Sequence, residues 1–267
     1  MSNANEASFL PVDLRDQRVV VTAGAGGIGR VIARAFQSRG ARVAICDVDT
    51  MALDDARAEF TGGVVEKADV SIPAEVAKFF QCVNGAWGGV DVLVNNAGIA
   101  GPTANVEDVT DDALDRTLDI NVSSQFYSAR HVVPGMKARR LGVIINLSSV
   151  AGRLGFTMRS PYSASKWAVI GFSKSLAVEL GEYEIRVNAL LPGHVRTDRF
   201  DRVVTSKATA LGLEKEEMRR QYLDVVSLKR NVEMTDIANM ALYLSSPFGR
   251  NVTGQAISVC GDVQMMR

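Results

Sequence analysis

Seven short apolar runs recur along the chain, and longer segments with mixed apolar and polar positions separate them. Most of these runs are β-branched and apolar on both faces, as is typical of parallel strands that helices cover on both sides. The runs lie at 18–22, 42–47, 64–69, 90–96, 142–149, 184–193 and 255–261. The segments between them are long enough for crossover helices. We therefore expect an α/β fold, a doubly wound parallel sheet of about seven strands in a single domain.

The positions of these runs also predict how the chain is divided. The first run begins at Arg18, so residues 1–17 are expected to be an N-terminal extension and residues 18–267 the single domain. At about 197–230 a charged helical pattern replaces a short connection. We interpret this stretch as an insertion that forms a substrate loop, since specificity is commonly built into loops on a rigid scaffold.

Composition excludes several classes of function. Of the 267 residues, 47% are hydrophobic, and 30 Lys and Arg balance 30 Asp and Glu, so neither nucleic acid nor an anionic membrane is an expected partner. We expect no secretory leader, because the N-terminus lacks an apolar core, and no membrane span. The widely spaced Cys46, Cys82 and Cys260 are expected to be buried, reduced thiols. With only two histidines we expect no metal site, and we predict a cytoplasmic protein.

The first candidate site is the glycine-rich stretch VVVTAGAGGIGR, which runs from a predicted strand into a predicted helix at 27–39. Glycines at such a turn let the backbone approach a pyrophosphate, which the N–H groups of the helix N-terminus then bind. The next strand ends in Asp47, beyond Gly29. A carboxylate there accepts hydrogen bonds from the adenosine ribose hydroxyls. The alternative for Asp47 is a helix cap or a solvated strand end, and the glycine-rich turn makes the ribose role the favoured one.

The second candidate site is the stretch PYSASK, which places Tyr162 and Lys166 one helical turn apart. Ser160 and Pro161 are expected to start this helix, as the hydroxyl N-cap and the first helical residue. An ordinary tyrosine is too weak an acid to serve as a base at neutral pH, but an adjacent ammonium and the positive end of a helix favour its phenolate form. The pair therefore suits general acid–base catalysis. A bare YxxxK motif is more often a surface pair, so the assignment depends on the rest of the chain.

With these motifs the chain resembles the short-chain dehydrogenase/reductase family. The nucleotide loop of that family is usually Thr-Gly-x-x-x-Gly-x-Gly, and Thr22, Gly27, Ile28 and Gly29 match it, with Ala23 in place of the first glycine. The resemblance covers nearly the whole chain and implies a Rossmann-type fold. It continues in order through ADV at 68–70, NNAG at 95–98, NV at 121–122, SS at 148–149, YSASK at 162–166 and PG at 192–193.

The resemblance implies a catalytic set of Asn121, Ser149, Tyr162 and Lys166. Tyr162 is expected to give or take a proton and Ser149 to hydrogen-bond the reacting oxygen, while Ser148 points the other way if the strand continues. Asn121 is expected to hold a water that links Lys166 to solvent, and Lys166 also to bind the nicotinamide ribose. The implied cofactor-binding residues are Gly24, Gly27, Ile28, Gly29, Asp47, Asp69, Val70, Asn95, Ala97, Gly98, Tyr162, Lys166, Pro192, Gly193, Val195 and Thr197.

The resulting hypothesis is an NAD(H)-dependent oxidoreductase acting on a secondary alcohol or ketone, or on a sugar or polyol hydroxyl, of a small-molecule substrate. NAD is expected as the cofactor because Asp47 would repel the 2′-phosphate of NADP, and Val48 offers no cation to bind one. An NADPH-dependent 3-oxoacyl thioester reductase is one alternative. A non-catalytic NAD-binding sensor or scaffold is the other, although a sensor needs no proton donor.

The helix that begins near Ser160 is apolar nearly all round and carries a stripe of small residues at Ala164, Ala168, Gly171 and Ser175. One side of such a helix is expected to face the sheet and the other a second subunit. The resemblance implies a homotetramer. Burial under the protein's own loops is the alternative.

Arginines gather in the segments expected to line the cleft, near His194. They are Arg153, Arg159, Arg196, Arg199 and Arg202. Arginine binds carboxylates and other oxyanions through paired N–H donors, so an anionic substrate is one hypothesis. The hypothesis we favour at this point is that Asp198 and Asp201 pair with these arginines on the surface, which leaves neutral sugars and polyols as substrates.

Overall fold

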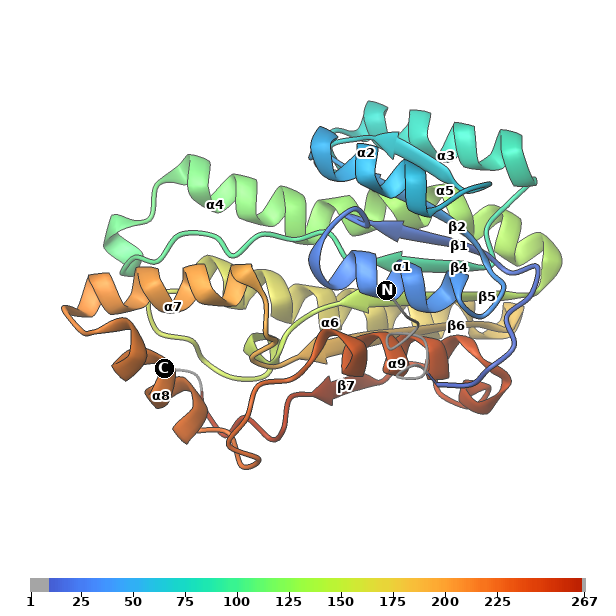
Figure 1. The fold of residues 1–267 in the computed structure, drawn as a ribbon. Coiled ribbons are helices and arrows are strands. Elements are labelled where there is room, and N and C mark those ends of the chain that lie inside the picture. Colours follow the sequence, from blue (N-terminus) through green and yellow to red (C-terminus); the bar gives the residue numbers. More distant parts are fainter. Residues whose placement is uncertain (1–9, 266–267) are drawn as a thin grey trace.

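The computed structural model describes residues 10–265, and its centre is one sheet of seven strands (Figure 1). All neighbouring strands pair in parallel, in the order β3-β2-β1-β4-β5-β6-β7. This arrangement confirms the α/β fold and the doubly wound parallel sheet predicted from the apolar runs. The strands are β1 (Arg18–Thr22), β2 (Arg42–Asp47), β3 (Val64–Lys67), β4 (Val92–Asn95), β5 (Gly142–Leu147), β6 (Ile185–Pro192) and β7 (Ala256–Val259).

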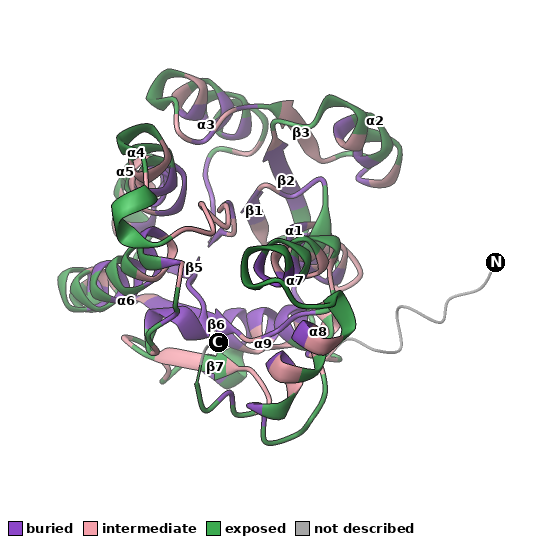
Figure 2. Ribbon diagram, turned by 90° about the vertical axis from the view of Figure 1, so that its left-hand side faces the viewer, coloured by how far each residue is buried: buried purple, intermediate pink, exposed green. Residues whose placement is uncertain are grey.

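Helices cover both faces of this sheet. On one face α1 (Gly27–Gln37), α2 (Thr50–Glu59) and α9 (Met234–Ser245) share an apolar cluster with the strands. On the other face α3 (Pro73–Trp87), α5 (Ser124–Arg139) and α6 (Ser160–Leu180) share a second cluster. Figure 2 shows buried central strands between helices whose outer sides are exposed, while the edge strands β3 and β7 are mostly half-buried. The central strands are apolar on both faces because both of their faces are buried.

The strand order reverses between β1 and β4, and this reversal positions the site. In an open parallel sheet, ligands bind at such a point, outside the carboxyl ends of the strands. The glycine-rich turn follows β1 and the NNAG segment follows β4, so both reach the same crevice. The backbone N–H groups of Asn96 and Ala97 each donate to Thr22 Oγ1 at 3.0 Å, which ties the two segments together.

Several strands are shorter than the apolar runs that predicted them. β3 ends at Lys67, β4 spans only Val92–Asn95, and β5 ends at Leu147. The residues beyond these ends leave the ladder for turns, as where Ser149 starts the 3₁₀ turn Val150–Gly152. An apolar run extends past its strand because the flanking turn is buried as well.

The charged stretch at 197–230 is helical, as its pattern predicted, and it forms two helices. These are α7 (Asp198–Leu211) and α8 (Lys215–Asp224), and they lie across the carboxyl ends of the strands (Figure 1). Both pack against the loop after β5. The apolar cluster that joins them consists of Ala151, Phe156, Phe200, Val204, Ala208, Met218 and Tyr222.

The start of α6 differs from the prediction by one residue. Arg159 occupies the N-cap position, Ser160 is already helical, and no side chain caps this end of the helix. The Arg159 guanidinium is buried and donates to the carbonyl oxygen of Ala100 and to Thr103 Oγ1. The helix therefore begins where tertiary contacts anchor Arg159, and the expected N-cap role of Ser160 is wrong.

The first residues that the structure describes pack on the domain. Leu14 is buried and its N–H donates to the Arg39 carbonyl oxygen, so residues 10–17 pack on the domain, while 1–9 lie outside the described residues. The division at residue 18 stays a prediction.

Cys46 is buried as expected, but Cys82 is exposed and Cys260 half-buried. Within residues 10–265 no helix is long and apolar enough to cross a membrane.

Candidate active site

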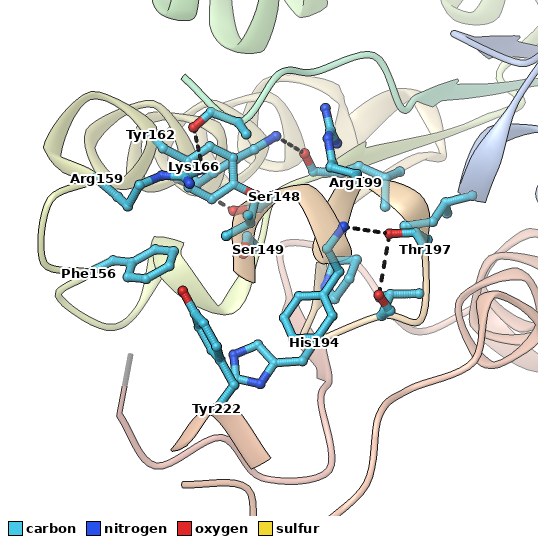
Figure 3. Close-up of a pocket in the computed structure, with 18 of the residues that line it drawn as sticks. Ser148, Ser149, Phe156, Arg159, Tyr162, Lys166, His194, Thr197, Arg199 and Tyr222 are labelled. Atoms are coloured by element: carbon cyan, nitrogen blue, oxygen red, sulfur yellow. Dashed lines mark hydrogen bonds between the residues drawn. The ribbon is translucent and has the colours of Figure 1, made fainter. Parts of the chain in front are cut away.

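A cavity of about 120 Å³ lies at the carboxyl ends of β5 and β6, below the first turns of α6 (Figure 3). Of the predicted catalytic set, Ser149, Tyr162 and Lys166 line it together. Five predicted cofactor residues join them, namely Ile28, Pro192, Gly193, Val195 and Thr197. The remaining lining residues are Asn96, Ala100, Leu147, Ser148, Phe156, Arg159, His194, Arg199, Phe200, Val203 and Tyr222.

The first two turns of α6 place Tyr162 and Lys166 on the side of the helix that faces the cavity. Lys166 Nζ lies 5.7 Å from the centroid of the Tyr162 ring and donates to the Leu147 carbonyl oxygen at 2.9 Å. Only 4% of Lys166 is exposed. Burial, and to a lesser extent the neighbouring charge of Arg199, lowers the pKa of Lys166 to about 7. A lysine in this state exchanges a proton easily near neutral pH.

Ser148 and Ser149, which follow the end of β5, both line the cavity. The Ser148 hydroxyl donates to the Lys166 carbonyl oxygen at 2.7 Å and so connects β5 to α6. Ser149 Oγ accepts the Ala151 N–H at 3.2 Å, which leaves its own hydrogen available for another acceptor. The Ser148 hydroxyl is thus used within the fold, and the expectation that it faces away from the reacting group stays a prediction, whereas Ser149 is the serine with a donor to spare.

Asn121 lies within a π-helical turn, Asp119–Ser123, between α4 (Asp111–Leu118) and α5. Its side chain is fully buried and accepts the Ile99 N–H while donating to the Ile99 carbonyl oxygen and to Ser165 Oγ. These bonds hold the loop after β4 against α6. Asn121 does not line the cavity, and its expected water-binding role stays a prediction.

The glycine-rich turn has the geometry of an anion site. α1 begins after Gly26 with no side chain capping it, so its first N–H groups are available to a ligand. A Cβ on Gly29 would lie 2.5 Å from Asn96 Nδ2 and closer still to the Ala23 carbonyl oxygen, so only glycine fits there. At the end of β2, Asp47 accepts the Ala25 N–H at 3.1 Å. These residues fit the pyrophosphate and ribose of a dinucleotide.

Ala23, which replaces the first glycine of the loop, has a left-handed backbone with φ of 50°. A residue with a Cβ adopts this conformation at a cost of about 1 kcal/mol. The Ala23 carbonyl accepts a hydrogen bond from Asn96 Nδ2 at 3.0 Å, which holds the turn in place. Ala23 thus holds a left-handed backbone conformation that glycine adopts more readily.

The other predicted cofactor residues do not line the cavity. Asp69 accepts hydrogen bonds from the backbone and hydroxyl of Ser71, and Val70 is buried in the core. The Asn95 side chain donates to Asn146 inside the sheet, and its neighbour Asn96, which the motif did not single out, lines the cavity instead. The residues that stand apart from the cavity are Gly24, Gly27, Gly29, Asp47, Asp69, Val70, Asn95, Ala97, Gly98 and Asn121.

An aromatic wall that the sequence did not predict closes the cavity. Phe200 and Tyr222 are the two aromatic residues of the stretch at 197–230, which was a usable signal for burial. The His194 ring centroid lies 5.3 Å from that of Phe200 and 5.0 Å from that of Tyr222. Burial lowers the pKa of His194 to about 4 and raises the pKa of Tyr222 to about 12. Both side chains are therefore neutral at pH 7.

The arginines noted in the sequence fall into two groups. Arg153, Arg196 and Arg202 lie on the surface, where Arg196 pairs with Glu233 at 3.1 Å. Arg159, which is buried, and Arg199, which is exposed, line the cavity. Among residues 10–265 neither Asp198 nor Asp201 forms an ion pair with any of these arginines, and Asp201 pairs with Arg219 of α8 at 2.8 Å instead. The expectation that Asp198 and Asp201 pair with these arginines on the surface, which the sequence favoured, is therefore wrong.

Comparison with known proteins agrees with this geometry. A family model described as enoyl-(acyl carrier protein) reductase matches residues 22–262. A putative ketoacyl reductase of the monensin polyketide synthase from Streptomyces virginiae is 36% identical, over 91% of this chain and 95% of that protein. Actinorhodin polyketide ketoreductase with NADPH has a TM-score of 0.89 and 32% identity, over 93% and 97% of the two chains. NAD⁺-bound xylitol dehydrogenase has a TM-score of 0.88 and 28% identity, over 92% and 98%.

The fold and the site define an oxidoreductase of the Rossmann class that acts on alcohol or ketone groups with a nicotinamide cofactor. The chain belongs to the short-chain dehydrogenase/reductase family.

Proposed function

We propose that this chain interconverts a secondary alcohol and a ketone with NAD(H), with Tyr162 as the general acid and base. The observation that carries the proposal is the convergence of Ser149, Tyr162 and Lys166 on one cavity beside the uncapped start of α1. When bound, a nicotinamide dinucleotide supplies the hydride chemistry, which no side chain of the cavity can perform.

The side chains of the cavity divide the proton chemistry among them. In the oxidising direction Tyr162 takes the hydroxyl proton of the alcohol, and in the reducing direction it returns that proton to the oxygen of the ketone. Ser149 donates the hydrogen that its bond with Ala151 leaves free to the same substrate oxygen. When protonated, Lys166 adds a positive charge beside the Tyr162 ring. Asn121 positions the loop and α6 around this group.

NAD(H) is the proposed coenzyme because of the charges near the end of β2. Asp47 presents a carboxylate where the ribose hydroxyls bind, and it would repel a 2′-phosphate. The nearby cations of α1 are already used, since Arg30 and Arg34 both pair with Glu59. Val48, next to Asp47, is exposed and carries no charge.

We also propose a homotetramer in the cytoplasm. The outer side of α6 exposes the small residues that the sequence singled out, and a groove of about 480 Å³ separates α6 from α5. Phe126 and Trp167 are 42% and 53% exposed beside it. An apolar, hollowed face of this kind is suited to a second copy of the chain. The three free cysteines are consistent with a reducing compartment.

A second candidate function is the NADPH-dependent reduction of 3-oxoacyl thioesters. The similarity to polyketide ketoreductases favours it. Acetoacetyl-CoA with NADPH, compared with secondary alcohols and NAD⁺, separates the two candidates. Faster turnover of the thioester would replace the first proposal with the second.

The test of the mechanism is Tyr162→Phe, assayed with NAD⁺ across a panel of secondary alcohols, polyols and hydroxy acids. Loss of the proton acceptor should lower kcat by at least about 10²-fold. Binding of NAD⁺, which is measured by thermal shift, should persist. Tyr183→Phe is the matched control, since Tyr183 lies beyond the far end of α6 and packs on Lys137. Near-normal turnover in Tyr162→Phe would refute the role of Tyr162.

A further inference from the structure

Three residues that line the cavity carry buried polar atoms without a hydrogen-bond partner. Among the described residues they include Nε of Arg159, both imidazole nitrogens of His194 and the hydroxyl of Tyr222. Arg159 is 2% exposed, His194 4% and Tyr222 1%. Figure 3 shows the Tyr222 hydroxyl directed toward Phe156, on the side of the cavity where Arg159 lies. Because a buried polar atom without a partner is unfavourable, the cluster indicates that a ligand completes these bonds.

Arg159 is the charged member of this cluster. A guanidinium has five N–H donors, and the structure uses two of its nitrogens, for the Ala100 carbonyl oxygen and for Thr103 Oγ1 at 3.3 Å. Its Cζ lies 5.4 Å from the ring centroids of both Phe156 and Tyr162, so it extends along the aromatic wall toward the proposed proton donor. Arg159 forms no ion pair within the described part of the chain, and guanidinium stays charged in proteins.

The surroundings add positive charge and no negative charge. Lys166 and Arg199 line the same cavity, and the buried Lys207 lies behind Phe156, 5.5 Å from its ring centroid. No aspartate or glutamate among residues 10–265 lines the cavity. A buried cation without a counter-charge is costly, so the cavity favours an anion. An adjoining cavity of about 270 Å³ is also bordered by positive charges, those of Arg159, Arg199 and Arg202.

We propose that the substrate is a hydroxy acid or oxo acid whose carboxylate is held by Arg159 and the Tyr222 hydroxyl. This inference rests on the proposed function, because it assigns the substrate class of the same cavity. A carboxylate accepts paired N–H donors in one plane, as a guanidinium edge offers them, and a neutral phenol hydroxyl provides a further donor. The rings of Phe156, Phe200 and Tyr222 surround the remaining space, which suits a compact apolar body between the carboxylate and the reacting carbon.

The inference is tested first by binding, which does not depend on turnover. Benzoate and benzamide are titrated against the protein saturated with NAD⁺, by calorimetry. We expect benzoate to bind at least about tenfold more tightly than benzamide, and Arg159→Met to abolish this preference. Arg159→Lys keeps a positive charge at this position and should retain part of the preference for benzoate. It therefore shows whether the effect of Arg159→Met comes from the lost charge or from a folding defect. Arg196→Met is the control, because Arg196 lies on the surface with Glu233 and should leave the preference unchanged.

Turnover then separates this inference from the proposed function. The assay compares 2-, 3- and 4-hydroxy acids with their methyl esters. Tyr222→Phe should raise the KM for the acids several-fold and leave the KM for the esters unchanged. If acids and esters react equally well in wild type and Arg159→Met, the carboxylate site is overturned and the redox function stands. If benzoate selectivity is present but no alcohol reacts, the redox function fails and the anion site stands. A preference for phosphate monoesters over carboxylates would overturn the assignment to a carboxylate.

Discussion

At the scale of single residues, the site contains charged side chains that are buried and a backbone conformation that is rare for its residue type. Lys166 and Arg159 are buried cations that have no carboxylate partner among residues 10–265, and Ala23 adopts a left-handed backbone conformation. Each of these features is unfavourable for folding alone. They are typical of sites where binding or proton transfer compensates for the local cost.

The first residue-scale prediction concerns the coenzyme. We expect the wild type to prefer NAD⁺ over NADP⁺ by at least about tenfold in kcat/KM, because Asp47 repels a 2′-phosphate. The double variant Asp47→Ala with Val48→Arg should erode this preference, whereas Val48→Arg alone should do so only in part. Steady-state kinetics with both coenzymes measures the effect. A lower KM and a higher kcat with NADP⁺ for the wild type would contradict the role given to Asp47.

The second prediction follows from the lowered pKa of Lys166, about 7 in the folded protein. An unfolded lysine titrates at about 10.4, so between these values the unfolded chain holds the extra proton and the wild type gains stability as pH rises. Lys166→Met removes this dependence. Without cofactor, we expect the variant to be about 1–3 kcal/mol more stable than the wild type near pH 6.5, and the difference to shrink near pH 9.5.

Urea unfolding at both pH values measures this difference, and comparison with the wild type cancels the titration of other groups. Lys174→Met is the control, since Lys174 is exposed on the same helix and should show no pH-dependent difference. A gap that stays constant between the two pH values would mean that Lys166 keeps an ordinary pKa.

At the scale of elements, local patterns predicted which segments are helices and strands but not where each one begins. α6 shows the limit clearly, because Ser160 and Pro161 form a good local start signal and the helix nevertheless includes Ser160. The position of Arg159 depends on contacts with Ala100 and Thr103, more than 50 residues away in sequence. The π-helical turn around Asn121 has the same origin, since its side chain binds Ile99 and Ser165. No periodicity within 119–123 encodes these partners.

At the scale of the whole molecule, the exposed side of α6 has a consequence for assembly. Ala164, Ala168, Gly171 and Ser175 are all exposed, so the alternative that the protein's own loops cover this stripe is wrong. Figure 2 shows the outer side of α6 facing solvent beside α5. Small residues let two such helices approach closely across a two-fold axis.

The prediction at this scale is that Gly171→Arg changes the oligomeric state without disturbing the fold. A Cβ on Gly171 meets no atom within 4 Å, so a single chain tolerates the arginine, whereas a second helix packed on the stripe does not. Sedimentation should give a tetramer for the wild type and a smaller species for the variant. Gly85→Arg is the matched control, because Gly85 is an equally open, exposed glycine on α3. A tetramer that survives Gly171→Arg would place the interface elsewhere.

Local patterns in the chain predicted the sheet, its helical layers, and the positions of the proposed nucleotide turn and proton donor. These features are local: apolar runs follow from burial on both faces, glycines from the close approach of backbones, and Tyr162 and Lys166 from the period of a helix. Contacts between distant segments, in contrast, set which of the arginines line the cavity, the pairing of Asp201 with Arg219, and the place of Tyr222 of α8 across the cavity from Arg159. The physical reason is that charge pairing and cavity shape depend on contacts between segments far apart in the chain, and a linear pattern does not rank such contacts against one another.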